Sequence, residues 1–148
     1  MPLRVVIDTN IWVSGLILPD STPGAVLDAV RSRQVVPVMS WAVARELVDV
    51  LRRPSVKRYG ITEGDIDDIL VVVGALLPDV DIAVEIRDPD DRPVIAAAIA
   101  GHADAIVIGD RDILGDPALR EWLRERGVTV LTAAELLARL RNRTTGGR

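Results

Sequence analysis

Four acidic residues, spread along the chain, stand where apolar segments end or helices begin. They are Asp8, Glu46, Asp91 and Asp110. Carboxylates are strongly solvated, so sequences seldom place them beside core segments without a reason. If the fold gathers these four, their negative charges repel one another, and a divalent cation bound between them relieves the repulsion. The pattern therefore predicts a metal-dependent enzyme.

The metal and the chemistry follow from the side chains that the sequence offers. The chain has no cysteine and one histidine, His102, which argues against a zinc site of thiolates or histidines and against metal-independent cleavage by a histidine pair. Mg²⁺ prefers oxygen ligands and keeps several waters, so a few carboxylates suffice to hold it. Two such ions about 4 Å apart can activate water and neutralise charge at a phosphodiester. We therefore expect Mg²⁺ or Mn²⁺ and phosphodiester hydrolysis.

The composition places limits on the class of protein. A chain of 148 residues that is 49% hydrophobic and 27% charged is expected to form one globular domain with an adequate core. Its net charge of −4 argues against broad, charge-driven binding of nucleic acid, although cations bound to clustered acids would restore a favourable charge. The start MPLRVVIDTN has no signal-peptide core, and no apolar stretch could span a bilayer. We expect a cytoplasmic protein without membrane contact.

Apolar runs alternate with segments of helical pattern along the chain. We expect strands at 3–7, 35–39, 105–108 and 128–131, and a short extended segment at 80–84. We expect helices at 10–18, 22–33, 41–53, 63–77, 93–102, 117–126 and 133–141, with N-caps at Ser21 or Thr22, Ser40, Thr62 and Thr132. This alternation predicts a three-layer α/β/α sandwich with a mostly parallel central sheet. Residues 1–142 would form the domain and residues 143–148 a flexible tail.

This topology would bring distant acids to one edge of the sheet. Sites in such folds lie beyond the carboxyl ends of the strands. Asp8 and Asp110 directly follow strands, and Asp91 begins a helix that faces the same edge. Glu46 lies within a helix, so it reaches this edge only if that helix packs beside it.

Several motifs, in this order, resemble a known family. VVIDTNIWVSGLI, SWAVARELVDVLRRP, RDPDDRPVIAAAIAGHADAIVIGDRDIL and VTVLTAAELL are similar to segments of PIN-domain nucleases. The closest subgroup is the VapC-like ribonucleases, the toxin components of bacterial toxin–antitoxin pairs. DTN alone is a weak signal, but DTN, DPDD-x-PV and GD-x-D in succession are specific. The resemblance covers residues 3–140.

The resemblance implies roles for particular residues. It implies that Asp8, Glu46, Asp91 and Asp110 are the catalytic and metal-binding acids, with Asp8 as the central ligand; within DPDD, Asp88 and Asp90 remain alternatives to Asp91. Further residues are expected to orient these acids or to contact phosphate. The first group is Thr9, Asn10, Asp88 and Asp112, and the second is Arg87, Arg92 and Arg111. Ile108 stands where the family commonly has threonine before GD, so one supporting hydroxyl is missing.

The same resemblance implies a substrate and partners. It implies Mg²⁺- or Mn²⁺-dependent endonucleolytic cleavage of RNA, a homodimer, and an antitoxin protein that covers the acidic cleft. Two other functions remain open. The chain could be a non-catalytic, partner-binding relative, or a phosphatase with Asp8 as nucleophile, although Asn10 stands where that chemistry expects a second aspartate.

Each candidate also has a purely structural interpretation. Asp8 could merely cap a helix, and one of the acids in DPDD is expected to do only that, since acids favour helix N-termini. His102 fits a helix end or the surface. Trp12 is better explained by core packing than by a substrate groove. The acids that open the helix at 63–77 are expected to be solvated, and we assign them no chemistry: Asp65, Asp67 and Asp68.

Overall fold

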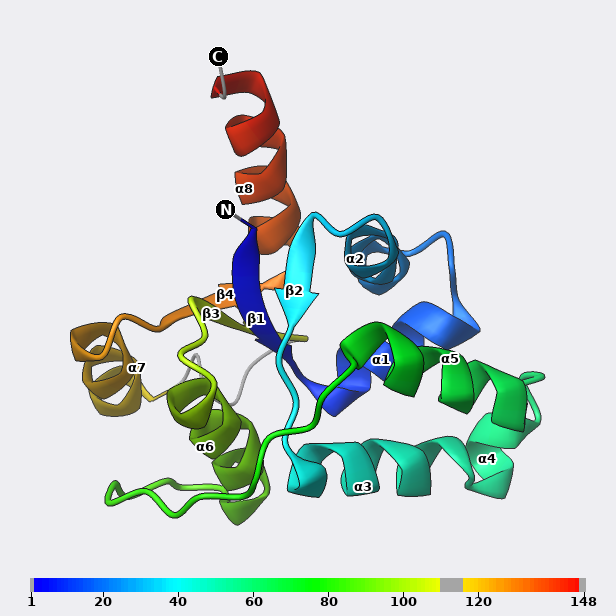
Figure 1. The fold of residues 1–148 in the computed structure, drawn as a ribbon, viewed down its shortest axis with the longest axis horizontal. Helices are drawn as coiled ribbons and strands as arrows, with labels where there is room; N and C mark the ends of the chain where they lie inside the picture. Colours follow the sequence, from blue (N-terminus) through cyan, green and yellow to red (C-terminus); the bar gives the residue numbers. More distant parts are fainter. Residues whose placement is uncertain (1, 110–115, 147–148) are drawn as a thin grey trace.

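The computed structural model describes residues 2–109 and 116–146, with side chains to residue 143. Within this part of the chain, four parallel strands form one sheet in the order β2-β1-β3-β4 (Figure 1). The strands are β1 (Leu3–Ile7), β2 (Val35–Pro37), β3 (Ala105–Ile108) and β4 (Thr129–Thr132). Every residue of β3 is buried, as expected of a strand covered on both faces. The predicted α/β class with a parallel central sheet is confirmed.

Helices cover both faces of this sheet. α6 and α7 pack on one side, against β1, β3 and β4, whereas α2 and α8 pack on the other and contact each other (Figure 1). α3 packs against α1, α5 and α6 beyond the end of the sheet. The helices are α1 (Thr9–Ile17), α2 (Thr22–Arg31), α3 (Trp41–Leu51), α4 (Pro54–Lys57), α5 (Glu63–Val73), α6 (Arg92–Ala100), α7 (Pro117–Glu125) and α8 (Ala133–Gly146), with the 3-10 turn η1 (Pro89–Asp91) before α6.

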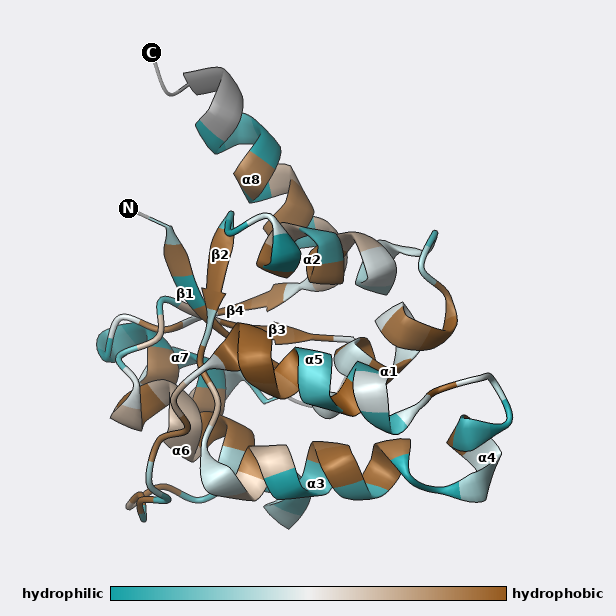
Figure 2. Ribbon diagram, turned by 45° about the vertical axis from the view of Figure 1, so that its right-hand side comes forward, coloured by the Kyte–Doolittle hydropathy of each residue, from teal (hydrophilic) through white to brown (hydrophobic). Residues whose placement is uncertain are grey.

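An aliphatic core holds these layers together, because the chain has no phenylalanine. Figure 2 shows β2 and β3 as apolar strands and α3 as a helix that alternates apolar and polar residues. Gly15 lets α1 approach α2 closely, since a Cβ there would stand 2.7 Å from Leu27 Cδ1. The largest fully buried side chains come from strands and helices alike: Ile7, Ile11, Leu27, Met39, Leu47, Leu51, Ile95, Ile106, Leu123 and Leu136.

Most helix starts follow the predicted caps. The Ser21 hydroxyl accepts from the backbone N–H of Gly24, 3.2 Å away, and the Ser40 hydroxyl accepts from that of Val43, 3.3 Å away. Thr62 and Asp65 form a reciprocal capping box at the start of α5. These bonds satisfy backbone donors that a helix start leaves unpaired.

Two helix ends were predicted wrongly. The helix expected at 63–77 ends at Val73, because Gly74 adopts a φ of +76°, which a helix cannot continue. Leu77 instead forms a bridge with Ser40. The helix expected at 133–141 continues to Gly146, so residues 143–146, expected to belong to a loose tail, are helical.

Other boundaries differ by less. α3 ends at Leu51, and Pro54 opens the short α4 instead of only ending a helix, as its fixed φ allows. Residues 80–84, expected to be a short extended segment, form no strand in the described chain. No helix among the described residues is both long and apolar enough to cross a membrane.

Candidate active site

Asp8 stands at the junction of β1 and α1. Its backbone N–H donates to the Val107 carbonyl of β3, 2.9 Å away, and its own carbonyl accepts from Ile11 N–H at 3.0 Å. The residue is half-buried. The main chain of Asp8 is therefore held by the neighbouring strand and by the first turn of α1, which fixes where its carboxylate can point.

The two residues after Asp8 differ in their surroundings. Thr9 is buried, and its Oγ1 atom has no hydrogen-bond partner within the described chain. The expectation that Thr9 or Asn10 orients Asp8 stays a prediction. Asn10 is exposed. A buried hydroxyl without a partner costs about 1–3 kcal/mol, and it lies directly beside the candidate site.

Glu46 reaches the site because α3 packs against both α1 and α6. The pKa of the Glu46 carboxyl is raised above its ordinary 4.5. Partial burial is the largest cause, although much of the side chain is exposed; the charges of Asp8 and Asp90 raise the pKa further, and Arg53 opposes them. Three segments far apart in sequence thus bring negative charge to one place.

The three acids of DPDD have different surroundings. Asp88 caps η1, since its Oδ1 accepts from Asp90 N–H at 3.0 Å. Asp90 is exposed, and its charge raises the pKa of Glu46. Asp91 is half-buried at the N-cap position of α6, and its backbone N–H donates to the Asp88 carbonyl. The sequence does not distinguish the three acids, because the backbone of η1 decides which of them caps the turn and which is exposed.

The remaining predicted acids lie outside the described residues. Asp110 and Asp112, with Arg111 between them, fall in the segment 110–115 that follows β3. Among residues 2–109 and 116–146, no three acidic or histidine side chains stand close enough together to bind a metal ion.

Two arginines flank the DPDD acids and differ in their contacts. The Arg92 guanidinium donates to the carbonyls of Ile82 and Val84 at 2.8 and 2.9 Å, so it ties the segment before η1 to α6. The Arg87 side chain is 76% exposed and lies 3.9 Å from Asp116 Oδ2. Arg87 is therefore better placed than Arg92 to meet a phosphate group.

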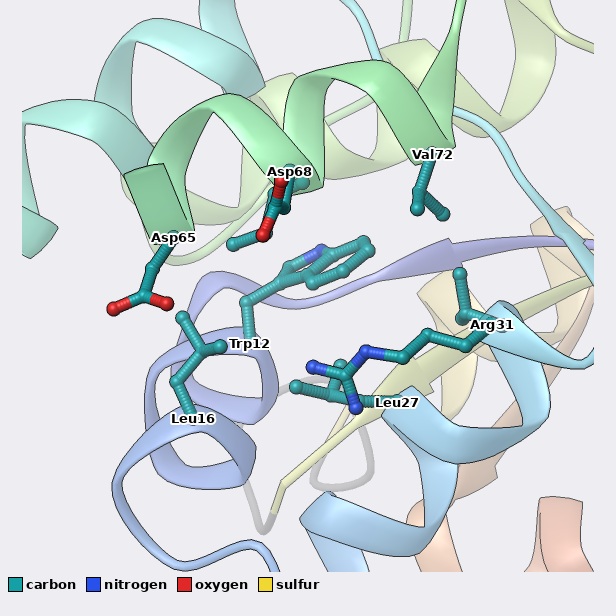
Figure 3. Close-up of a pocket in the computed structure, with 9 residues that line it drawn as sticks. Trp12, Leu16, Leu27, Arg31, Asp65, Asp68 and Val72 are labelled. Atoms are coloured by element: carbon teal, nitrogen blue, oxygen red, sulfur yellow. The ribbon is translucent and has the colours of Figure 1, made fainter. Parts of the chain in front are cut away.

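A small, partly open pocket lies elsewhere, between α1, α2 and α5 (Figure 3). Its volume is about 70 Å³, and Trp12, Leu27, Arg31 and Asp68 are among the residues that line it. Trp12 is 2% exposed, which agrees with the core role predicted for it. None of the candidate acids lines this cavity, so the chemistry is not located here.

The sequence of this chain matches the model of a known protein family. The family model described as PIN domain matches residues 4–112, a span that holds all four candidate acids. The chain belongs to the PIN-domain family. A PIN-domain protein is generally a nuclease, so membership supports a hydrolase that acts on nucleic acids, and such nucleases usually use divalent metal ions.

One curated protein is also similar to this chain in sequence. The uncharacterised protein MJ1680 of Methanocaldococcus jannaschii is 31% identical over 116 residues, which cover 76% of this chain and 74% of the relative. No solved structure matches this chain. The family assignment therefore rests on the PIN-domain model, and the parallel α/β fold agrees with it.

Proposed function

We propose that this PIN-domain protein is an Mg²⁺- or Mn²⁺-dependent endoribonuclease, and that it is the toxin of a toxin–antitoxin pair. The observation that carries the proposal is that the fold of this PIN-domain chain brings Asp8 and Asp90 close enough to Glu46 to act on it: partial burial first, and then these two charges, raise the pKa of the Glu46 carboxyl. Carboxylates from two other segments that raise the pKa of a third are costly for a fold. Such a cost is expected where a functional site needs the charge.

The side chains fit a hard divalent cation. The donors are carboxylate oxygens, which Mg²⁺ and Mn²⁺ prefer, and a cation would offset the repulsion felt by Glu46. Asp8, Asp110 and one acid of DPDD, with Asp91 as the first choice and Asp90 as the alternative, would hold the metal together with Glu46. When bound, the metal would supply charge neutralisation at the phosphate and an activated water.

The chain's own residues would position the substrate. Asp8 would act from a backbone fixed to β3 and α1. Glu46 would hold a metal-bound water or a second ion from its place on α3. Arg87 would bind a phosphate oxygen at the edge of the site, and Arg111 would serve the same purpose from the segment after β3.

RNA as substrate, the toxin role, the homodimer, the antitoxin and the cytoplasmic location are supported by the motif resemblance to VapC-like ribonucleases. A nuclease of this kind needs restraint in its own cell, which an antitoxin segment over the acidic cleft would provide. These features are proposed together with the activity.

Cleavage assays test the activity. We expect the purified protein to cut single-stranded RNA with Mg²⁺ or Mn²⁺, to cut matched DNA less, and to be inactive in EDTA. Asp8→Asn should abolish cleavage, whereas Asp67→Asn, which removes an exposed acid of α5, should not. Full cleavage by Asp8→Asn would overturn the site, and trapping of an aspartyl-phosphate on Asp8 would favour phosphatase chemistry instead.

Expression in bacteria tests the toxin role. We expect the wild-type protein to arrest growth and Asp8→Asn to relieve the arrest at equal protein level. Normal growth with active, soluble wild-type enzyme would contradict the toxin role while leaving the nuclease activity standing.

A further inference from the structure

A groove lies beside the DPDD acids, between the segment that precedes them and α7. Its volume is about 690 Å³, and its walls include Val84, Ile86, Arg87 and Trp122. Arg87 directly precedes Asp88, so one end of this groove, called here the α7 groove, adjoins the candidate active site. Its size falls within the range of about 300–1,000 Å³ that is usual for small-molecule sites.

An aromatic side chain forms part of one wall. Trp122 is half-buried, and the Arg126 guanidinium stacks over its ring at 3.8 Å from the centroid. Arg126 also donates to the Trp122 carbonyl at 2.9 Å. The stacked guanidinium restricts the motion of the indole on one face, and the bond to the Trp122 carbonyl holds the Arg126 side chain in place. An aromatic ring that is already fixed loses little entropy when a nucleobase packs against it.

The groove lining is of mixed charge, with Arg87 and Arg92 beside Glu85 and Asp116, and the Arg87 side chain is 76% exposed. Asp116, whose side chain is 13% exposed, caps α7 by accepting from Leu119 N–H and lies 3.9 Å from Arg87 Nε. This contact keeps the Arg87 guanidinium near the groove. Arg92 braces the wall opposite α7 through its bonds to Ile82 and Val84.

We propose that the α7 groove binds one nucleotide of a single-stranded RNA next to the bond that is cut, with its base against Trp122 and its phosphate on Arg87. This proposal rests on the RNA cleavage proposed above. In it, the α7 groove helps to determine at which position the RNA is cleaved. Arg87 supplies the positive charge that binds a phosphate. The apolar surface for a base comes from Trp122, Val84 and Ile86. The DPDD acids directly follow Arg87 in the chain, so the bound phosphate would lie on their side of the groove.

Other hollows fit a nucleotide less well. The hollow between α2 and α8 has a similar volume, about 680 Å³, but aliphatic residues such as Leu137 and Leu140 line it without an aromatic ring. The cavity beside Trp12, about 70 Å³, is too small for a nucleotide. Neither adjoins the DPDD acids.

The experiment compares variants of the two contact residues with matched controls. Trp122→Leu and Arg87→Ala are tested against Trp41→Leu, an exposed tryptophan outside the groove, and Arg120→Ala, an exposed arginine on α7 that does not line it. Thermal unfolding verifies that each variant folds. Each enzyme then cleaves an RNA pool randomised around one position, and the cut sites are sequenced.

We expect Trp122→Leu and Arg87→Ala to raise KM by roughly tenfold and to flatten the sequence preference at one position, with a smaller effect on kcat. Trp122→Phe should restore much of the preference. An unchanged cut-site profile and KM for both Trp122→Leu and Arg87→Ala would overturn the groove as a nucleotide site and would leave it to a protein partner.

Binding by a catalytically inactive protein separates this inference from the proposed function. In the Asp8→Asn background, a fluorescent single-stranded RNA should bind more weakly when Trp122→Leu is added. If the wild-type protein cuts no RNA but this binding difference is present, the proposed nuclease fails and the groove stands. If cleavage is normal and neither binding nor cut sites change, the groove fails and the nuclease stands.

Discussion

Two glutamates on neighbouring helices illustrate two uses of acidic side chains in this protein. Glu46 of α3 has a raised pKa, since partial burial and the charges of Asp8 and Asp90 disfavour its ionised form. Glu63 of α5 has a lowered pKa, because hydrogen bonds at 3.1 and 2.6 Å and the positive charge of Arg52 favour its ionised form. The residue type is the same, and the neighbours decide the direction.

The start of α5 and the acid cluster around Glu46 differ in what balances their charge. In α5, Asp65 accepts from Thr62 N–H at 2.8 Å within the capping box, and Glu63 pairs with Arg52. Around Glu46, partial burial and the charges of Asp8 and Asp90 raise the pKa, and the charge of Arg53 lowers it. A dense run of acids in the sequence therefore marks a stable helix start, whereas dispersed acids that meet in space mark the candidate site.

The largest contrast is expected in catalysis. Glu46→Gln should lower metal-dependent RNA cleavage by roughly a hundredfold, as loss of a well-placed general base or ligand commonly does. Glu63→Gln should leave the rate within about twofold, because surface pairs contribute little and this one lies outside the site. Initial rates at saturating metal measure both. Equal losses in the two variants would remove the distinction between the two groups of acids.

Metal binding should sharpen the same contrast. A cation that binds only the folded protein stabilises it by about 2.7 kcal/mol at a hundred times its Kd. For a chain of this length this corresponds to an increase in Tm of roughly 5–10 °C. We expect this shift with Mn²⁺ in wild type and Glu63→Gln, and a much smaller one in Asp8→Asn. Scanning calorimetry with and without EDTA measures it, and a full shift in Asp8→Asn would place the metal elsewhere.

Substitution of the N-cap residues of α3 and α5 tests whether a loss of stability and a loss of cleavage activity can occur separately. Ser40→Ala and Thr62→Ala should each destabilise the fold by about 1 kcal/mol, as loss of an N-cap usually does. Ser40 caps the helix that carries Glu46, so Ser40→Ala should also lower cleavage at a temperature where the protein is fully folded. Thr62→Ala should not. Denaturant unfolding and cleavage rates are compared, and a loss of activity in Thr62→Ala alone would contradict this assignment.

The smallest effects concern pH. The pKa of Glu46 in the folded protein is above 4.5, its ordinary value in the unfolded chain. Without metal, ionisation of Glu46 therefore lowers the free energy of unfolding. This loss is absent below about pH 4.5 and grows as the pH rises through the folded pKa. Glu46→Gln should therefore stabilise the metal-free protein at pH 7 but not at pH 4. Glu63 has the opposite sign: its contribution is present above 4.5 and is lost as pH falls through its lower folded pKa.

Urea unfolding at several pH values tests both signs. Glu63→Gln should lower stability at pH 7, with the difference from wild type narrowing as the solution is acidified. If Glu46→Gln proves less stable than wild type at pH 7 without metal, the repulsion inferred around Glu46 is absent.

The sequence by itself determined the strands, the caps and the class of fold. A continuous apolar, β-branched run such as 105–108 indicates a strand that is buried on both faces. The Ser40 and Thr62 hydroxyls accept hydrogen bonds from backbone N–H groups of the helices that they cap. These signals are local, so no knowledge of distant neighbours is needed to interpret them. The same is true of the motif order that predicted the family.

Tertiary structure decided what depends on packing and on backbone direction. The end of α5 was missed because Gly74 leaves the helical region, and a favourable apolar pattern through Leu77 does not reveal that φ. The position of Glu46 required α3 to pack against α1 and α6, and the different contacts of Asp88, Asp90 and Asp91 required the turn of η1. Electrostatic coupling falls with distance in space and not with distance in sequence, so only the folded chain shows which acids act on Glu46.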